Sequence, residues 1–293
     1  MAQRAQLTET AASSRSGVLL AVAAVIMFST SPVFVLLAAP LSAYEITVGR
    51  LAIGAALVAT LGRLNRQPLL PMRVDLPRFA LFGLIAAVHF LSYIASLGFT
   101  TIAHSLAVVY TAPIFVALFS AWFLGEKLTR RKWLGVLVTV AGIGVLAGFE
   151  PRWSQRMLIG DLLALVSAIT FGLYSVAGRS QRERYGLFTY TSTVYGLGAL
   201  WALPAAALAM TPAAYHPGSL AALLAAGLIP LGIGHTLYNA ALRRTHATIP
   251  NLIATQEVTG GILLGALVLN QIPQVNELVG AFVALIGIAL VLI

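Results

Sequence analysis

The chain has 293 residues, of which 59% are hydrophobic and only 9% are charged. Soluble domains carry roughly 25% charged residues, so this composition nearly excludes a soluble enzyme or binding domain. The net charge of +9 would indicate nucleic-acid binding in a soluble protein, but here the basic residues lie between long apolar runs. We interpret them as orientation signals at a membrane surface and expect no nucleic-acid partner. The absence of cysteine excludes disulfides and thiolate metal sites.

The apolar runs predict an all-α polytopic membrane protein with ten transmembrane helices. A span needs about 20 apolar residues, and the first run is too long for a signal peptide, so we expect it to stay in the membrane. The polar segment Met1–Ser16 is predicted to be a mobile cytoplasmic tail. In chain order the predicted spans are Gly17–Ala38, Ala43–Gly62, Phe79–Phe99, Ser105–Leu124, Trp133–Phe149, Leu158–Gly178, Leu187–Met210, Leu220–Leu242, Ala247–Leu269 and Val275–Ile293.

Lysine and arginine residues are concentrated on one side of the predicted bilayer. The opposite loops hold only Arg152 and Arg156, and Arg50 lies inside a span. Because basic loops stay in the cytoplasm, both termini are predicted to be cytoplasmic, in a bacterial inner membrane. The basic residues of the cytoplasmic side are Arg4, Arg15, Arg63, Arg66, Arg73, Arg78, Lys127, Arg130, Arg131, Lys132, Arg179, Arg182, Arg184, Arg243 and Arg244.

An internal repeat divides the chain into residues 17–149 and 158–293. GVLLAVAAVIMFSTSPV from Gly17 aligns without gaps on GDLLALVSAITFGLYSV from Gly160, with seven identical positions. The period is five spans, an odd number, so the second half must enter the bilayer from the opposite side. The prediction is therefore two inverted five-helix repeats, with the substrate site near the midplane where they meet. A second set of matches, at an offset of 145, pairs Gly135, Val138, Gly142 and Ile143 with Gly280, Val283, Gly287 and Ile288.

The segment GEKLTRRKWLGVLVTVAGIGVL at 125–146 resembles the signature that closes each half of EamA-type members of the drug/metabolite transporter (DMT) superfamily. Arg50 and the stretch YTAPIFVALFSAWFLGEKL around Pro113 fit the same pattern, and the resemblance covers essentially the whole chain. The chain is also similar to the aromatic amino acid exporter (YddG) branch. The resemblance implies a ten-helix exporter of amino acids, metabolites or drugs. The chain departs from the family pattern in its second half, where Asn270 and Gln271 replace the Gly-Glu pair.

The sequence contains no catalytic motif. GxSxG, HExxH, a Walker lysine loop and a strand-linked GxGxxG are all missing. Buried Ser and His leave an intramembrane protease open in principle, but nothing pairs them. We therefore expect no enzymatic activity, no catalytic residue, no cofactor and no metal site, and transport by this chain alone is not expected to use ATP.

Placing a polar side chain inside a membrane span costs free energy, so each such residue is a candidate functional residue. Two one-sided patches, in the third and eighth spans, are predicted to line a substrate cavity, with interhelical hydrogen bonding as the alternative. Glycine and proline precede the second patch and could open its helix. The residues of the two patches are His89, Ser92, Tyr93 and Ser96, and His235, Tyr238 and Asn239.

Tyr110, just before Pro113, and Tyr174 are further candidates for substrate contact. Hydroxyls beside prolines, including that of Thr111, are expected to bond backbone carbonyls. Glu257 lies near the centre of its span and must be protonated, paired or exposed to a wet cavity. Arg50 lies at a similar depth, so it either pairs with Glu257 or bonds backbone carbonyls. We assign these two as possible coupling or buried-charge residues.

The leading hypothesis is a secondary exporter that moves small organic molecules by alternating access. Amphipathic amino acids, including aromatic ones, and related metabolites fit the predicted lining. A broad drug/metabolite efflux carrier, a receptor or sensor, and a channel are the alternatives. The expected partners are the substrate and the lipid bilayer. The GxxxG spacings Gly144–Gly148 and Gly261–Gly265 are interpreted as packing within a monomer, with a dimer contact as the minority interpretation.

Overall fold

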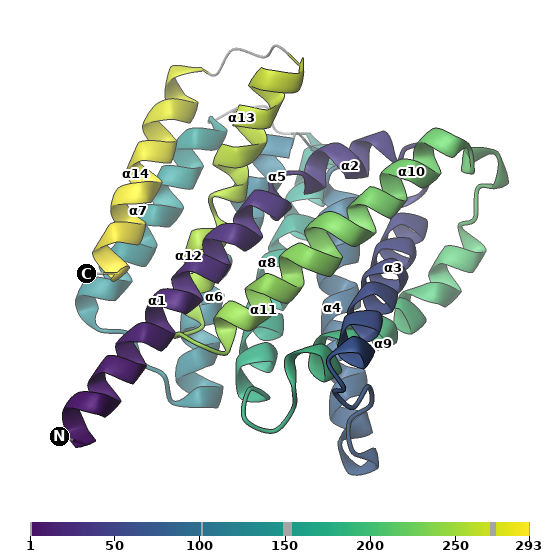
Figure 1. The fold of residues 1–293 in the computed structure, drawn as a ribbon. Coiled ribbons are helices and arrows are strands. Elements are labelled where there is room, and N and C mark those ends of the chain that lie inside the picture. Colours follow the sequence, from purple (N-terminus) through teal and green to yellow (C-terminus); the bar gives the residue numbers. More distant parts are fainter. Residues whose placement is uncertain (1, 101, 149–153, 270–273, 293) are drawn as a thin grey trace.

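The computed structural model describes residues 2–100, 102–148, 154–269 and 274–292, and within these ranges every regular element is a helix (Figure 1). The elements of the first half are α1 Ala2–Phe28, α2 Ser31–Leu37, α3 Ala43–Leu64, η1 Arg73–Asp75, α4 Leu76–Ser96, α5 Ile102–Val109, α6 Ala112–Phe119, η2 Ser120–Leu124 and α7 Arg130–Ala147. Those of the second half are α8 Gln155–Ser180, α9 Leu187–Leu208, η3 Pro212–Ala214, α10 Pro217–Ala226, η4 Gly227–His235, α11 Thr236–Leu242, α12 Thr248–Ala254, α13 Glu257–Leu269 and α14 Val275–Leu292.

The outer surface of the bundle is apolar. Large side chains such as Leu134, Trp201 and Phe282 are more than half exposed, which in water would leave a costly apolar surface but suits contact with lipid. This pattern is typical of a multi-pass membrane protein. Among the described residues, seven helical segments are long and apolar enough to cross a bilayer, namely Ser14–Leu37, Ala43–Leu64, Arg73–Ser96, Ser105–Leu124, Gln155–Ser180, Leu187–Leu208 and Pro217–Leu242.

The other three predicted spans lie in α7, in α12 and α13, and in α14. α7 has 18 residues and opens with three basic ones, Arg130–Lys132. The ninth predicted span is divided between two helices at Thr255 and Gln256. The apolar part of α14 is the short stretch Leu278–Leu292. Membrane crossing by these three segments stays a prediction.

The N-terminal segment predicted to be a mobile tail, Met1–Ser16, is helical over its described residues, and its mobility stays a prediction. α1 begins at Ala2 and continues without a break into its apolar part. Its first turns are built mainly from alanine, glutamine, arginine, leucine and glutamate, which favour helix, and no glycine or proline occurs before Gly17. A polar composition is therefore compatible with helix in this segment.

Equivalent helices of the two halves pack against each other. α7 packs along α14, and α3 packs along α9. Gly135 lies beside Val291, whereas Gly142 lies beside Ala284, so α7 and α14 run antiparallel. A Cβ atom on Gly142 would collide with the backbone of Ala284, and this glycine therefore permits close approach of the two helices. The two-repeat architecture is thus visible in the packing.

Glycines of the repeat pack closely against neighbouring helices, whereas two glycines of the GxxxG spacings do not. A Cβ atom on Gly144 or Gly261 would meet no atom within 4 Å. Gly148 ends α7 with a positive φ of 69°, which is a capping role. The interpretation of these spacings as close helix packing was therefore wrong at Gly144 and Gly261, because they face away from neighbouring helices.

The fourth span of each half is broken at the equivalent place. α5 ends at Val109 and α6 begins at Ala112, whereas α12 ends at Ala254 and α13 begins at Glu257, an offset of 145. The hydroxyl of Thr111 donates to the carbonyl of Val108 at 2.8 Å, as predicted for a hydroxyl beside a proline. Broken backbone at membrane depth is tolerated only where protein buries it or a cavity adjoins it, so both breaks mark the centre of the molecule.

Four of the loops predicted to be cytoplasmic meet at one end of the bundle, the lower end in Figure 1. The side chain of Gln67 accepts a hydrogen bond from the backbone of Phe188 at 3.3 Å. Arg243 donates to the carbonyl of Tyr185 at 2.8 Å, and Arg179 bonds Glu126. We call this end of the bundle the basic face. The connection between α9 and α10 lies at the opposite, upper end (Figure 1).

Candidate functional site

Polar and aromatic side chains from both halves surround a small cavity at the centre of the bundle. Its volume is about 20 Å³, roughly the room that one water molecule needs. A larger ligand therefore requires the surrounding helices to separate. The cavity is lined by Phe28, Ser31, Arg50, His89, Phe90, Tyr93, Leu106, Val109, Tyr110, Phe171, His235 and Glu257.

The Glu257 carboxylate is held by two tyrosines from the other half. It accepts a hydrogen bond from the hydroxyl of Tyr110 and a second one, 3.4 Å long, from the hydroxyl of Tyr93. Glu257 is the first residue of α13, where the partial positive charge of a helix N-terminus favours a carboxylate. Tyr110 stands at the equivalent break between α5 and α6. The two helix breaks therefore bring Tyr110 and Glu257 together, and Tyr93 joins them from α4.

Arg50 reaches the same cavity from α3 and is only 2% exposed. Its guanidinium carbon lies 5.6 Å from the centre of the Phe90 ring. Its Nε and Nη1 atoms have no hydrogen-bond partner among the described residues, so neither atom pairs with Glu257 or bonds a backbone carbonyl. A buried donor without an acceptor is costly. A ligand group that accepts from these atoms would stabilise the site.

His89 and His235 face each other beside the cavity, with ring centres 6.4 Å apart. They are 146 positions apart, close to the repeat offset, and so occupy nearly equivalent places in the third span of each half. The Nδ1 atom of His89 lies 3.0 Å from the carbonyl of Ser167, and its ring stacks on Phe171 at 4.7 Å. His235 packs on Phe28 at 4.4 Å. This histidine pair places the cavity between the two repeats.

Tyr174, Tyr238 and Asn239 form a second polar cluster beside the cavity and do not line it. Asn239 donates to the hydroxyl of Tyr174 at 2.5 Å, and the Tyr238 hydroxyl lies 2.7 Å from that of Ser175. Asn251 donates to the same Tyr238 hydroxyl at 3.1 Å. These contacts join α8, α11 and α12. They agree with the alternative interpretation of the second patch, in which its polar side chains form hydrogen bonds between helices.

Ser92 and Ser96 also lie away from the central cavity. Ser96 donates to the carbonyl of Tyr93 at 2.7 Å, and Ser92 borders a separate, mostly apolar cavity of about 580 Å³ next to α2 and α3. The helical period explains the difference, because Ser92 is turned roughly 60° from His89 and Ser96 lies about two turns further along. The polar residues on this one face of α4 therefore lie in three different surroundings: the central cavity, the separate apolar cavity and a contact with the backbone of Tyr93.

Sequence reasoning missed the apolar half of the lining. Phe28, Phe90 and Phe171 surround the two histidines, but single aromatic residues in apolar spans carry no distinguishing signal. Ser31 also lines the cavity, next to Pro32 and the break between α1 and α2. That break was the available signal, because a broken helix inside a membrane protein marks a site.

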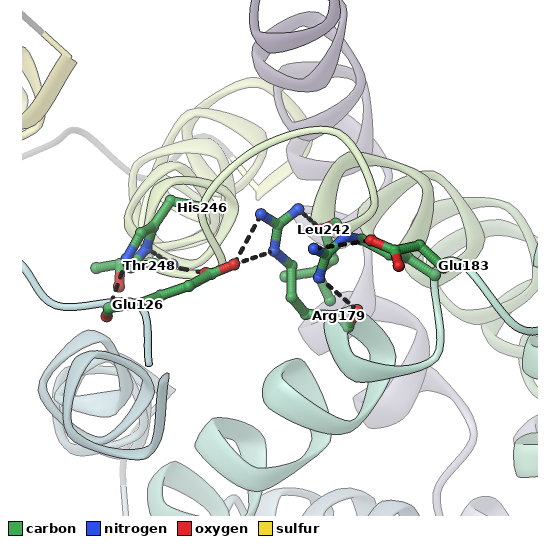
Figure 2. A network of polar contacts seen from close by, with 7 residues as sticks. Glu126, Arg179, Glu183, Leu242, His246 and Thr248 are labelled. Atoms are coloured by element: carbon green, nitrogen blue, oxygen red, sulfur yellow. Dashed lines mark hydrogen bonds and ion pairs between the residues drawn. The ribbon is translucent and has the colours of Figure 1, made fainter. Parts of the chain in front are cut away.

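A separate polar network lies at the basic face, away from the central cavity. Glu126 follows Gly125, whose φ of 68° ends η2, and its carboxylate accepts from Arg179 Nε at 2.9 Å. Arg179 Nη2 approaches the same oxygen at 2.8 Å, while its Nη1 donates to the carbonyl of Leu242 at 2.9 Å (Figure 2). The ring of His246 lies 3.2 Å from the carbonyl oxygen of Glu126. This network joins one loop of the first half to two segments of the second.

The described residues contain no group of three or more His, Cys, Asp or Glu side chains placed to hold a metal ion. Asn270 and Gln271, which depart from the family pattern, lie outside the described residues. The chemistry of the central cavity is therefore that of hydrogen bonds, two buried charges and aromatic rings.

Comparison with known proteins shows what kind of protein carries this cavity. The model of the EamA-like transporter family matches residues 15–148 and again residues 158–293. The chain belongs to the EamA-like transporter family. The resemblance to EamA-type transporters is confirmed, and this EamA protein is a membrane transporter rather than an enzyme.

Two relatives of this EamA protein are named as exporters. It is 28% identical over 275 residues to the pseudopaline exporter CntI of Pseudomonas aeruginosa, covering 93% of this chain and 94% of the relative. It is 26% identical over 188 residues to the "Probable terminal-alkyne amino-acid exporter" of Streptantibioticus cattleyicolor, covering 61% and 60%. A solved crystal structure matches with a TM-score of 0.78 and 22% identity, covering 94% of this chain and 96% of that one, and supports the fold.

Proposed function

We propose that this protein exports amino acids, including aromatic ones, and related small metabolites from the cytoplasm by alternating access. In this proposal ten helices cross the bacterial inner membrane as two inverted repeats, residues 17–149 and 158–293, acting as a monomer. The segment Met1–Ser16 and both termini are cytoplasmic, in accordance with the fifteen basic residues predicted on that side.

The observation that carries the proposal is the cavity between the repeats. Two equivalent helix breaks deliver Tyr110 and Glu257 to it, and equivalent histidines border it from each half. In inverted-repeat transporters the substrate site lies at this interface and uses broken helices. The mixture of aromatic rings, hydroxyls and two buried charges suits a small amphipathic molecule. The pseudopaline exporter supports export as the direction of transport, and the probable terminal-alkyne amino-acid exporter supports an amino acid as the substrate.

Alternating access requires one face to open while the other is closed. The Glu126–Arg179 ion pair supports closure of the basic face in this conformation, because it joins both halves there. We propose that the pair breaks when the site opens toward the cytoplasm.

Broad drug and metabolite efflux is the second candidate. The small central cavity and its two buried charges favour compact polar molecules over large neutral drugs. A receptor or sensor without transport is a weaker candidate, because the family match describes transporters.

Transport by purified protein in liposomes tests the proposal. We expect saturable, counterflow-stimulated uptake of at least one labelled amino acid from a panel that includes phenylalanine, tyrosine and tryptophan. Liposomes without protein give the background. Uptake of neutral drugs but of no amino acid would favour broad efflux instead, and uptake that neither saturates nor responds to counterflow would refute the carrier mechanism.

Cysteine labelling in intact cells tests the orientation. A cysteine placed in the loop Arg63–Arg78 should be protected from impermeant reagents, whereas one near Arg152 should react. The natural chain has no cysteine, so the background is low. The reverse pattern would overturn the proposed topology.

A further inference from the structure

Arg50 is a buried cation whose hydrogen-bonding capacity is largely unused. Its side chain is 98% buried, two of its nitrogens have no acceptor among the described residues, and it borders the central cavity. Its guanidinium carbon lies 5.6 Å from the centre of the Phe90 ring. This cation–π contact replaces part of the stabilisation that water would give the charge. A planar guanidinium with free donors is suited to bind a carboxylate through two parallel hydrogen bonds.

Glu257 supplies the complementary charge in the same cavity. Tyr93 and Tyr110 occupy part of its accepting capacity, but a carboxylate has about four lone-pair positions and can accept further bonds. The two tyrosines hold the carboxyl group in place and leave accepting positions on it unoccupied. An ammonium group can therefore bind beside them.

We propose that Arg50 and Glu257 together recognise a zwitterion, in which Arg50 binds the carboxylate and Glu257 binds the ammonium of an α-amino acid. This inference deepens the proposed amino acid export and depends on it. The cavity holds one positive and one negative side chain, so a zwitterion satisfies both and leaves no net charge buried. An anionic ligand would leave Glu257 without a positively charged group, and a cationic ligand would leave Arg50 without a negatively charged one. Either ligand would leave one buried charge unpaired, which costs desolvation free energy.

The rings of Phe28, Phe90 and Phe171 form the other part of the recognition. They border the same cavity and pack on the two histidines at 4.4 to 4.8 Å. Aromatic rings provide large apolar area for an apolar or aromatic substrate side chain. The charged groups thus bind the part shared by all α-amino acids, while the rings select the side chain.

A ligand series that keeps one side chain and removes one charge tests the inference on the unmodified protein. Binding of L-phenylalanine, of its amide, which lacks the carboxylate, and of 3-phenylpropionate, which lacks the amine, is measured on purified protein in nanodiscs. We expect the amide and 3-phenylpropionate each to bind about tenfold or more weakly than phenylalanine. Equal binding of all three would overturn the inference.

Variants then assign each charge. Arg50→Met should abolish the preference for phenylalanine over its amide, whereas Arg50→Lys should retain part of it. Glu257→Gln should abolish the preference for phenylalanine over 3-phenylpropionate. Ser96→Ala, a buried polar change outside the cavity, serves as the matched control and should keep both preferences. If Arg50→Met does not fold, Arg50→Lys and the ligand series on the unmodified protein still decide the question.

The outcomes separate the inference from the proposed function. Amino acid counterflow in liposomes, with charge-deleted analogues competing as well as phenylalanine, would refute the zwitterion site and leave export intact. Absence of both binding and counterflow across the amino acid panel would refute both.

Discussion

Breaking the Glu126–Arg179 ion pair should open the basic face of the transporter. In Glu126→Gln the side chain keeps its shape but loses its charge, so both short hydrogen bonds from Arg179 are weakened. Arg179 cannot easily find another partner, because its third nitrogen is already committed to the carbonyl of Leu242.

The magnitude follows from burial and geometry. The Arg179 and Glu126 side chains are 13% and 18% exposed, and the two contacts are 2.9 and 2.8 Å long. Charge-assisted hydrogen bonds contribute about 1.5–3 kcal/mol, and partial screening by water reduces this. We expect the closed face to lose about 1.5–2 kcal/mol, which raises the open population roughly 10- to 30-fold.

Reactivity of a buried cysteine measures this opening. Ser175 is fully buried and lies one turn before Arg179 on α8. In Ser175→Cys, labelling by an impermeant thiol reagent in inside-out vesicles should accelerate about tenfold when Glu126→Gln is added. The matched control is Glu183→Gln, which removes an exposed ion pair with Arg182 at the same face and should change nothing. An unchanged rate in the Glu126→Gln variant would refute the gating role.

Three further predictions concern the same protein. Burial lowers the pKa of His246 below its ordinary value of 6.5, an effect that the Glu126 carboxylate opposes. As the pH falls below 6.5, His246 therefore binds a proton more readily in the open conformation, where water surrounds it, than in the closed one. The closed conformation should lose stability in this pH range, and labelling of Ser175→Cys should accelerate. His246→Gln should remove this pH dependence. If Glu257 carries the coupling proton, Glu257→Gln should abolish stimulation by a pH gradient while exchange at saturating substrate continues; persisting stimulation in a folded variant would exclude the role. Tyr93→Ala should weaken substrate binding about tenfold, because Tyr93 lines the cavity, whereas Tyr238→Ala should chiefly destabilise the protein by about 2–5 kcal/mol; equal effects on affinity in a titration would contradict this distinction.

Much of the architecture could be predicted because it depends on local composition. Helical structure, the repeat and the family resemblance all follow from apolar runs and short matched segments. The break before Pro113 was foreseeable, since proline cannot donate to the preceding turn. The equivalent break before Glu257 was not foreseen, because its residues, Thr255 and Gln256, include no proline.

The candidate site was predicted less completely. Glu257 and Arg50 were selected by their charge at membrane depth, and both reach one cavity. Ser92 and Ser96 share a stripe with His89 yet lie elsewhere, because small differences in rotation and height along α4 decide which neighbour each one meets. The Glu126–Arg179 ion pair joins residues 53 positions apart and has no local signature.

The sequence by itself determined that this chain is a helical, repeated membrane transporter, since hydropathy, charge distribution and the duplicated segments are properties of the chain alone. Only the tertiary structure decided which polar residues share a cavity. That choice depends on how α1, α3, α4 and the two broken helices pack together, and packing brings Arg50, Glu257, Tyr93 and Tyr110 to one point. Contacts between distant segments arise from the complementary shapes of helix surfaces, which no stretch of sequence specifies alone.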